Sequence, residues 1–211
     1  MALGSERRLV GIGMARDLQY NAAEHISPET AADPYLRPAF VASDRVRRLI
    51  WNLCWALLYR PSPRPIFCWR AFLLRRFGAT LGLNCKFYPG SRIWAPWNLT
   101  CADMVAVADD VEIYNPAPLR LGSHTNLSQG AYLCGATHDY DDPAFPLLAY
   151  AMEVGANAWI CARASVAPGV SVGEGAVLGL GSVATRDLAP WTIYAGVPAV
   201  KLKERERSAS A

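Results

Sequence analysis

Large apolar residues recur every six positions through most of the chain beyond residue 80. They form three runs of differing phase, with Ala184 as the one small member: Leu81, Phe87, Ile93, Leu99, Val105 and Val111, then Leu121, Leu127 and Leu133, then Val154, Ile160, Val166, Val172, Leu178 and Ala184. In the third run, the residues one and four places after each of the first five lead positions are small, as Gly155 and Ala158 are after Val154. Neither a heptad helix nor a simple alternating strand has this pattern.

A period of six fits a coil of short flat faces joined by tight turns. The large residue fills the interior of each face, the small residues fit where the chain bends, and glycine supplies the backbone freedom of the turns. Each rung buries its lead residues only against the rungs above and below, so several must stack. An antiparallel sandwich would account for scattered valines and glycines but not for a fixed period. The sequence therefore predicts an all-β solenoid over residues 81–200.

The period is interrupted twice. The first break is a step of ten residues, which predicts a four-residue bulge around Asn115, and the second is a step of 21 residues from Leu133 to Val154. His138 is the sixth residue of the Leu133 hexad, the last regular position before the excursion of residues 138–153. We therefore expect its imidazole to be held on a rigid rung at the mouth of a loop, which suits a catalytic group.

Ahead of the repeats, residues 44–77 predict two short helices. A proline-rich linker, PSPRP, separates them, because proline lacks the N–H donor that a helix interior needs. Both helices carry tryptophan beside arginine. Two roles stay open and are compatible: covering the exposed first rung, or lying in a membrane interface. The predicted divisions are an arm without clear pattern (1–43), an Arg/Trp-rich helical cap (44–80), the solenoid with its loop 138–153 (81–200) and a charged tail (201–211).

Charge and cysteine content limit the partners and the compartment. The net charge of +3 is too small to indicate nucleic acid, but eight arginines and no acidic residue lie between Arg45 and Arg76. The longest apolar run, residues 49–59, has 11 residues, where a membrane span needs about 20. The six scattered cysteines form no CxxC pair, and the N-terminus has no long apolar signal. These features are typical of a cytoplasmic protein, at the inner face of the membrane if the helices bind lipid.

Several stretches resemble one known family. The segment VGANAWICARASVAPGVSVGEGAVLGLGSVATRDLAPWTIYAGVPAVKLK (154–203) is similar to the C-terminal half of the hexapeptide-repeat acyltransferases, whose fold is a left-handed parallel β-helix. APWNLT (95–100), SQGAYLCGATHDY (128–140) and AGVPA (195–199) most resemble the colanic-acid-type polysaccharide acetyltransferases, in the branch that also holds maltose and galactoside O-acetyltransferases. The resemblance covers about residues 66–203 and implies this fold for the predicted solenoid.

The resemblance gives His138 a role. In the family, the histidine of a Thr-His motif takes the proton of the acceptor hydroxyl, which then attacks the thioester of acetyl-CoA directly. The matching residue here is His138 in ATHDY, and an imidazole titrates near neutral pH, as such a base must. His124 should point outward and have a structural or subunit-interface role. His25 lies outside the repeats and is interpreted as incidental.

Two residues near the interruptions are candidates for binding the acceptor. Asn115 could meet a sugar through its amide, which both donates and accepts hydrogen bonds, or it could simply start a turn, as Asn-Pro commonly does. Asp139 could orient the His138 ring beside the acceptor, or belong with Asp141 and Asp142 to the solvated face of the loop. Both alternatives stay open from the residues alone.

The resemblance also implies a track for acetyl-CoA along the outside of the last coils. Trp159, in AWIC, matches a tryptophan that packs on the pantetheine arm near its thiol end, or else covers only surface. Ala162 and Leu180 lie where the family's main chain bonds the arm, in the way that an extended peptide is bound by a strand.

The residues that bind the CoA phosphates in the family are only partly matched in this sequence. Thr185 and Arg186, in ATRD, resemble the family's Thr-Lys step, at which a cation meets a CoA phosphate. After AGVPA the family often has a basic residue, but Val200 stands there in this chain. Lys201 or Lys203 would then have to supply the second cation.

Together these features predict an acetyl-CoA-dependent O-acetyltransferase acting on a sugar hydroxyl, in exopolysaccharide assembly, with a free or lipid-linked saccharide as acceptor. The family implies a homotrimer with active sites between subunits. Alternatives are transfer of acetyl or a longer acyl chain to an amino sugar, and a non-catalytic assembly solenoid. A zinc hydrolyase of the γ-type carbonic anhydrase kind is disfavoured, and no metal is expected, because such a site needs three placed histidines and the coil has two.

Overall fold

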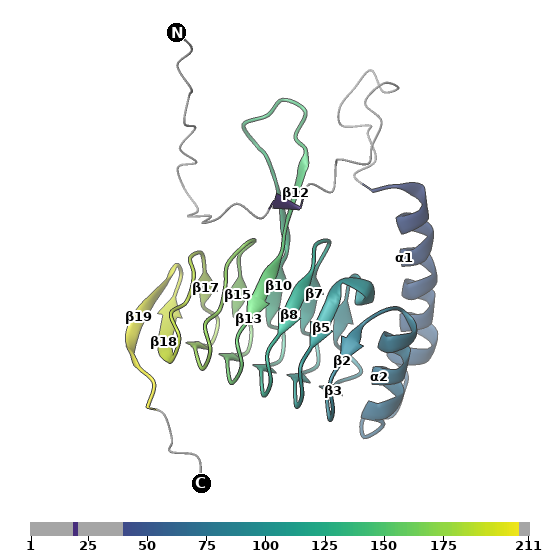
Figure 1. Cartoon of the computed structure of the whole chain (residues 1–211), viewed down its shortest axis with the longest axis horizontal. Helices are drawn as coiled ribbons and strands as arrows, with labels where there is room; N and C mark the ends of the chain where they lie inside the picture. Colours follow the sequence, from purple (N-terminus) through teal and green to yellow (C-terminus); the bar gives the residue numbers. More distant parts are fainter. Residues whose placement is uncertain (1–18, 21–39, 207–211) are drawn as a thin grey trace.

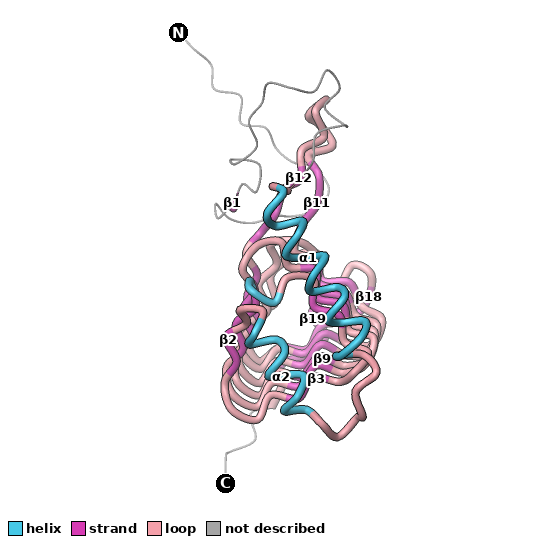
Figure 2. Tube along the Cα trace, turned by 90° about the vertical axis from the view of Figure 1, so that its right-hand side faces the viewer, coloured by secondary structure: helices cyan, strands magenta, loops and turns pink. Residues whose placement is uncertain are grey.

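The computed structural model describes residues 19–20 and 40–206, and its main body is a parallel β-solenoid (Figures 1 and 2). Three sheets form its faces, and the chain visits them in the order first, second, third. The first face holds β2 (Thr80–Leu81), β5 (Leu99–Cys101), β8 (Leu119–Leu121) and β13 (Met152–Val154). The second holds β3 (Lys86–Phe87), β6 (Ala106–Val107), β9 (Asn126–Leu127), β14 (Trp159–Ile160), β16 (Val177–Leu178) and β18 (Thr192–Gly196). The third holds β4 (Arg92–Ile93), β7 (Glu112–Tyr114), β10 (Tyr132–Cys134), β15 (Ser165–Val166) and β17 (Val183–Ala184).

The lead residues of the hexads fill the interior, as the period predicts. Ile160 pairs with Leu127 on one side and with Leu178 on the other, and all three are fully buried. At the corners the chain turns through a residue in the left-handed region, such as Gly175 with φ +65°. A Cβ at Gly175 would lie 2.5 Å from the Trp191 ring, so this corner requires glycine. The predicted solenoid of hexapeptide repeats is confirmed.

The phase assigned to part of the first run is wrong. Strand register pairs Leu81 with Cys101, Phe87 with Val107 and Ile93 with Ile113, so Cys101, Val107 and Ile113 are the lead residues of the second coil. The predicted leads of that coil are buried too but occupy other inward positions: Leu99, Val105 and Val111. A step of eight residues after Ile93, through a 3-10 turn at Pro96–Asn98, causes the shift.

All three insertions into the period lie at the corner between the third and first faces. Besides the step after Ile93, there is one of eight residues from Ile113 to Leu121, not the predicted ten, so the bulge at Asn115 contains two extra residues rather than four. The third interruption, after Leu133, is the long excursion. Because the insertions follow the same face, they stack along a single edge of the solenoid.

The long excursion is a β-hairpin that stands out from the coil (Figures 1 and 2). Its strands are β11 (Ala136–His138) and β12 (Leu147–Tyr150), which pair antiparallel, and β1 (Gln19–Tyr20) pairs with the other edge of β12. The segment predicted as loop, 138–153, therefore contains β12 and the start of β13. At the base of the hairpin, the N–H of Gly135 donates to the Tyr114 carbonyl at 2.7 Å, which joins it to the rung below.

The N-terminal helices cover the first rung. They are α1 (Ala42–Cys54), continued by a π-helical turn η3 (Trp55–Tyr59), and α2 (Phe67–Arg76), with the proline-rich linker between them. The indole N–H groups of Trp51 and Trp55 donate to the carbonyls of Ile93 and Ser91, at 2.7 and 2.9 Å. A π-helix has more residues per turn than an α-helix, which keeps Tyr59 on the same inner face, where its hydroxyl bonds Ser91. Both helices therefore lie against the first rung of the solenoid.

A hairpin closes the C-terminal end of the solenoid. Strand β19 (Ala199–Glu204) pairs antiparallel with β18, so the first residues of the predicted tail, 201–211, are a strand. The guanidinium of Arg205 then donates to the carbonyls of Asn157 and Gly175 on the corner above. His25 lies outside the described residues.

Candidate active site

His138 is the last residue of β11 and lies on the projecting hairpin, so the predicted position on a rung is wrong. The rung ends at Cys134, where β10 leaves the third face. The exposed imidazole is nevertheless held at two points by Phe145: its Nδ1 lies 2.9 Å from the Phe145 carbonyl oxygen, and the two rings stack 4.4 Å apart at an interplanar angle of 8°. A carbonyl can only accept, so in the neutral imidazole this contact places the proton on Nδ1 and the lone pair on Nε2.

Asp139 is tied into the turn of the hairpin. Its N–H donates to the Pro146 carbonyl at 3.0 Å, and its Oδ1 accepts from the N–H of Asp141 at 3.1 Å. These contacts form an Asx-type turn, so the carboxylate supports the loop, while the Phe145 carbonyl orients the His138 ring. A contact of Asp139 with an acceptor stays a prediction.

The side chain of Asn115 points into the fold, where it joins two coils. Its side chain is buried, and both ends of its amide bond Ala95 on the previous coil: Oδ1 accepts from the Ala95 N–H at 3.0 Å and Nδ2 donates to the Ala95 carbonyl at 2.8 Å. Asn98 in turn donates to the carbonyls of Asn115 and Pro116. The two amides join successive insertions, which builds the edge from which the His138 hairpin rises.

Trp159 lies on the outside of the second face and is 44% exposed. Its Nε1 donates to the Ser128 hydroxyl at 2.8 Å, which directs the indole toward the corner between the second and third faces. The bond fixes the ring and leaves a flat apolar surface open to a ligand. Burial raises the pKa of the nearby Cys161 thiol, so this cysteine is protonated and unreactive near neutral pH.

Ala162 and Leu180 occupy equivalent positions on that corner in consecutive coils. The N–H of Gly181 donates to the Ala162 carbonyl at 3.0 Å, so the two turns are joined directly, about 4.8 Å apart as neighbouring strands are. Within the described residues, the N–H groups of Ala162 and Leu180 have no hydrogen-bond partner. They are two unpaired backbone donors on neighbouring coils, at the corner toward which the Trp159 indole is directed.

Beyond Leu180 this corner leads to a hollow at the C-terminal end of the solenoid. Its volume is ≈ 430 Å³, and it lies between the last rung of the third face and the tip of the β18–β19 hairpin. The lining residues are Val183, Thr185, Arg186, Val197, Pro198, Ala199 and Val200. Arg186 is exposed and makes no ion pair with any described residue, so its charge is available to an anion.

Lys201 is not brought into this hollow. Its ammonium pairs with the Glu204 carboxylate, a contact that raises the pKa of Lys201 and lowers that of Glu204. Val200 does line the hollow, so the position at which the family often has a cation is apolar here. Arg186 is therefore the candidate cation that the geometry favours.

The candidate residues thus divide between two edges of the third face. Trp159, Ala162 and Leu180 gather at its junction with the second face, whereas the hairpin of His138 leaves at its junction with the first. Successive corners are six residues apart along the chain, so these edges are at most ~20 Å apart at about 3.3 Å per residue. A single chain therefore presents the histidine and the two backbone donors on opposite sides of one face.

Two contributors were not found from the sequence. Phe145 lies in the irregular tip of the hairpin, where no period exists to place it. Ser128 begins a turn one coil before Trp159, and only the register of β9 with β14 shows that they are neighbours. His124 is at the third position of a turn with φ +59°, in keeping with a structural role. Among residues 40–206, no group of three His, Cys, Asp or Glu side chains could hold a metal ion.

Sequence and structure comparisons identify the family. No protein-family model matches the sequence. The colanic acid biosynthesis acetyltransferase WcaF of Escherichia coli (strain K12) is 36% identical over 166 residues, which is 79% of this chain and 91% of that protein. The galactoside O-acetyltransferase of the same strain is 27% identical over 149 residues, covering 64% of this chain and 68% of that enzyme.

Solved structures agree on the fold. A hexapeptide-repeat acetyltransferase of Vibrio cholerae, crystallised with acetyl-CoA, superimposes with a TM-score of 0.73 at 21% identity, over 81% of this chain and 93% of that one. A galactoside acetyltransferase in complex with coenzyme A gives 0.71 at 21% identity, over 78% and 83%. By its identity to WcaF over most of both chains, this chain belongs to the hexapeptide-repeat acetyltransferases, in the colanic-acid-type branch.

Proposed function

We propose that this protein transfers the acetyl group of acetyl-CoA to a hydroxyl of a saccharide in polysaccharide assembly, with His138 as the general base. The carrying observation is the geometry of His138, whose Nδ1 faces the Phe145 carbonyl at 2.9 Å. That contact leaves Nε2 as an acceptor on an exposed face of the hairpin. An acceptor hydroxyl bonded to Nε2 loses its proton as its oxygen attacks the thioester carbon, and the coenzyme leaves as the thiolate.

Acetyl-CoA fits the opposite edge, where the two backbone donors lie. The outward N–H groups of Ala162 and Leu180 can bond the amide carbonyls of the pantetheine arm, and the open face of Trp159 can pack on its thiol end. The hollow beside Arg186 offers a cation to a phosphate group of the nucleotide. Relatives support this reading, since the Vibrio cholerae structure was solved with acetyl-CoA and WcaF is named for colanic acid biosynthesis.

A direct transfer is favoured over a covalent cysteine intermediate. The Cys161 thiol is nearest in sequence to the two backbone donors, and burial raises its pKa. A protonated thiol is a poor nucleophile. The hydroxyl activated by His138 is therefore the better attacking group.

The division of residues between two edges supports a homotrimer. In a three-fold ring, each interface joins unlike surfaces of neighbouring subunits. The His138 edge of one chain can then meet the Trp159 edge of the next, which would complete an active site that neither chain forms alone.

Binding of acetyl-CoA tests the cofactor assignment without knowledge of the acceptor. We expect calorimetric titration to show saturable binding near one site per chain. A Trp159→Ala, Arg186→Ala double variant should bind at least about tenfold more weakly, since it loses the packing surface and the free cation. A Leu83→Ala variant, also altered at an exposed apolar residue, should bind as the wild type does. No binding at millimolar acetyl-CoA by the folded protein would exclude the proposed function.

Sedimentation tests the assembly. We expect a mass of three times the chain mass of 23.0 kDa, independent of acetyl-CoA, because the interface does not require the ligand. A monomer that nevertheless binds acetyl-CoA and turns over would show that each chain completes its own site.

A further inference from the structure

Helix α1 with its π-helical extension has apolar residues on two opposite faces. The inner face carries Trp51, Trp55 and Tyr59, which bond the first rung. The outer face carries residues at helical spacing, each more than half exposed (54–69%): Val46, Leu49, Ile50, Leu53 and Leu57. Capping the solenoid requires only the inner face, so it gives no reason for the outer residues to be apolar.

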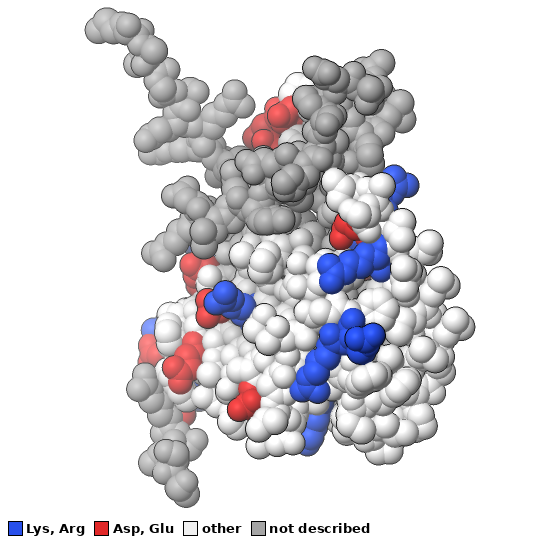
Figure 3. Space-filling model, turned by 45° about the vertical axis from the view of Figure 1, so that its right-hand side comes forward, with Lys and Arg blue, Asp and Glu red and all other residues white. Residues whose placement is uncertain are grey.

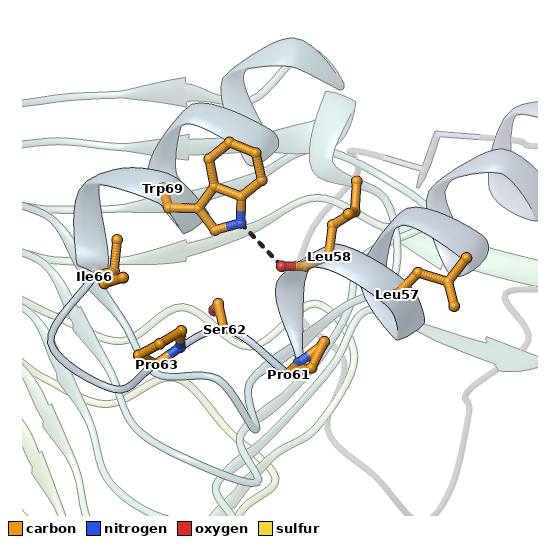
Figure 4. A pocket seen from close by; sticks show the side chains of 7 residues that line it. All are labelled: Leu57, Leu58, Pro61, Ser62, Pro63, Ile66 and Trp69. Carbon is orange, nitrogen blue, oxygen red and sulfur yellow. Dashed lines mark hydrogen bonds between the residues drawn. The ribbon is translucent and has the colours of Figure 1, made fainter.

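The outer stripe continues onto α2 and the linker. Trp69 of α2 stacks on Phe72 with ring centroids 5.8 Å apart, and both rings are exposed. The Trp69 indole N–H is satisfied by the Leu58 carbonyl at 2.9 Å. A shallow hollow of ≈ 430 Å³ between the two helices is lined by Leu57, Leu58, Ile66 and Trp69, with Pro61, Ser62 and Pro63 of the linker (Figure 4). We call the stripe, this hollow and Phe72 the outer cap face.

Cations border this face. Arg45, Arg60 and Arg76 are exposed and form no ion pair with a described carboxylate. Between Arg45 and Arg76 the sequence has no acidic residue. In the space-filling view, basic side chains lie along the margin of a broad uncharged surface, and most acidic side chains lie toward the far end (Figure 3). A partner for this face should therefore be apolar at its centre and anionic at its margin.

We propose that the outer cap face lies on a phospholipid bilayer containing anionic lipids, with α1 in the plane of the interface. Exposed leucines and isoleucine enter the acyl boundary, the rings of Trp69 and Phe72 lie at headgroup depth, and the flanking arginines bond lipid phosphates. No helix among the described residues is long and apolar enough to cross a membrane. The proposed attachment is peripheral, and it needs both apolar insertion and charge.

Vesicle sedimentation with the full-length wild-type protein tests this proposal. We expect binding to phosphatidylcholine vesicles that contain about one third phosphatidylglycerol, at least ~tenfold weaker binding to phosphatidylcholine alone, and release as salt rises. A Leu53→Glu, Leu57→Glu variant should lose at least ~tenfold in partitioning. Both side chains are exposed, so its melting temperature should stay that of the wild type. The matched control, Leu202→Glu, alters an equally exposed leucine at the opposite end of the solenoid.

Three outcomes would overturn the proposal: no binding of the wild type to anionic vesicles, equal binding of both variants, or a smaller sedimentation mass of the Leu53→Glu, Leu57→Glu variant without lipid. The last result would identify the face as a contact between copies of the chain. The assay contains no acetyl-CoA or saccharide, so its failure leaves the proposed transferase activity untouched.

Discussion

Replacing His138 by alanine is expected to lower kcat by about a thousandfold while the affinity for acetyl-CoA stays unchanged. A positioned general base contributes typically 10²–10⁴-fold, and His138 contacts neither Trp159 nor the hollow at Arg186. Release of the CoA thiol, followed colorimetrically with a saccharide acceptor found by screening, measures kcat. Calorimetry measures the affinity.

His124→Asn is the matched control. His124 is likewise exposed, and asparagine tolerates its positive φ, so both the turn and the activity should survive. Activity of His138→Ala within threefold of the wild type would place the base on another residue. Loss of acetyl-CoA affinity in the same variant would instead mean that the hairpin shapes the cofactor site.

The period of six predicted the solenoid, but it did not predict the phase everywhere. Val105 and Val111 are as large as the other lead residues, whereas Cys101 is small. A prediction that chose the large apolar residues therefore assigned the second coil two residues out of register. Both sets of positions point inward, and burial selects for apolar residues at each. Only the pairing of rungs, which depends on residues a full coil apart, distinguishes them.

The positions of candidate residues on regular coils could be predicted from the sequence, but the position of the residue on the hairpin could not. Trp159, Ala162 and Leu180 follow the hexads, and the structure brings them together. His138 was placed on a rung because its count fits a sixth position, whereas pairing of Ala136–His138 with Leu147–Tyr150 takes the chain outward. Antiparallel pairing of this kind depends on a partner strand on the far side of an irregular hairpin tip. A repeat period in the sequence cannot predict that partner.

Asn115 shows the limit of residue type as a guide. An amide beside an insertion can bind a sugar or join two segments of backbone, and its chemistry is the same in both cases. The presence of Ala95 at hydrogen-bonding distance on the neighbouring coil decides for the structural role. That neighbour is 20 residues away in the sequence, and the two-residue insertions that bring it there were not both recognised.

Replacing Arg70 by alanine is expected to lower the free energy of unfolding by about 3–5 kcal/mol. Its side chain is fully buried between α2 and the first rung, where the guanidinium donates to the carbonyls of Phe87, Pro63 and Arg64 and to the Ser62 hydroxyl. The prolines at 61, 63 and 65 have no N–H group, so the linker cannot form the regular backbone hydrogen bonds of a helix or strand. Arg70 instead donates hydrogen bonds to the linker carbonyls. Burial lowers the pKa of Arg70, but an arginine remains charged at neutral pH.

Urea unfolding at fixed protein concentration measures the effect, with Arg76→Ala as the control. Arg76 is exposed at the end of the same helix, so its loss should change the free energy of unfolding by less than ~0.5 kcal/mol. Arg70→Lys should recover less than half of the loss, because a single ammonium cannot span four acceptors placed around a planar fork. If Arg70→Ala is as stable as Arg76→Ala, water satisfies the linker carbonyls. The cap would then be attached to the first rung by its remaining contacts, among them the hydrogen bonds of Trp51, Trp55 and Arg75.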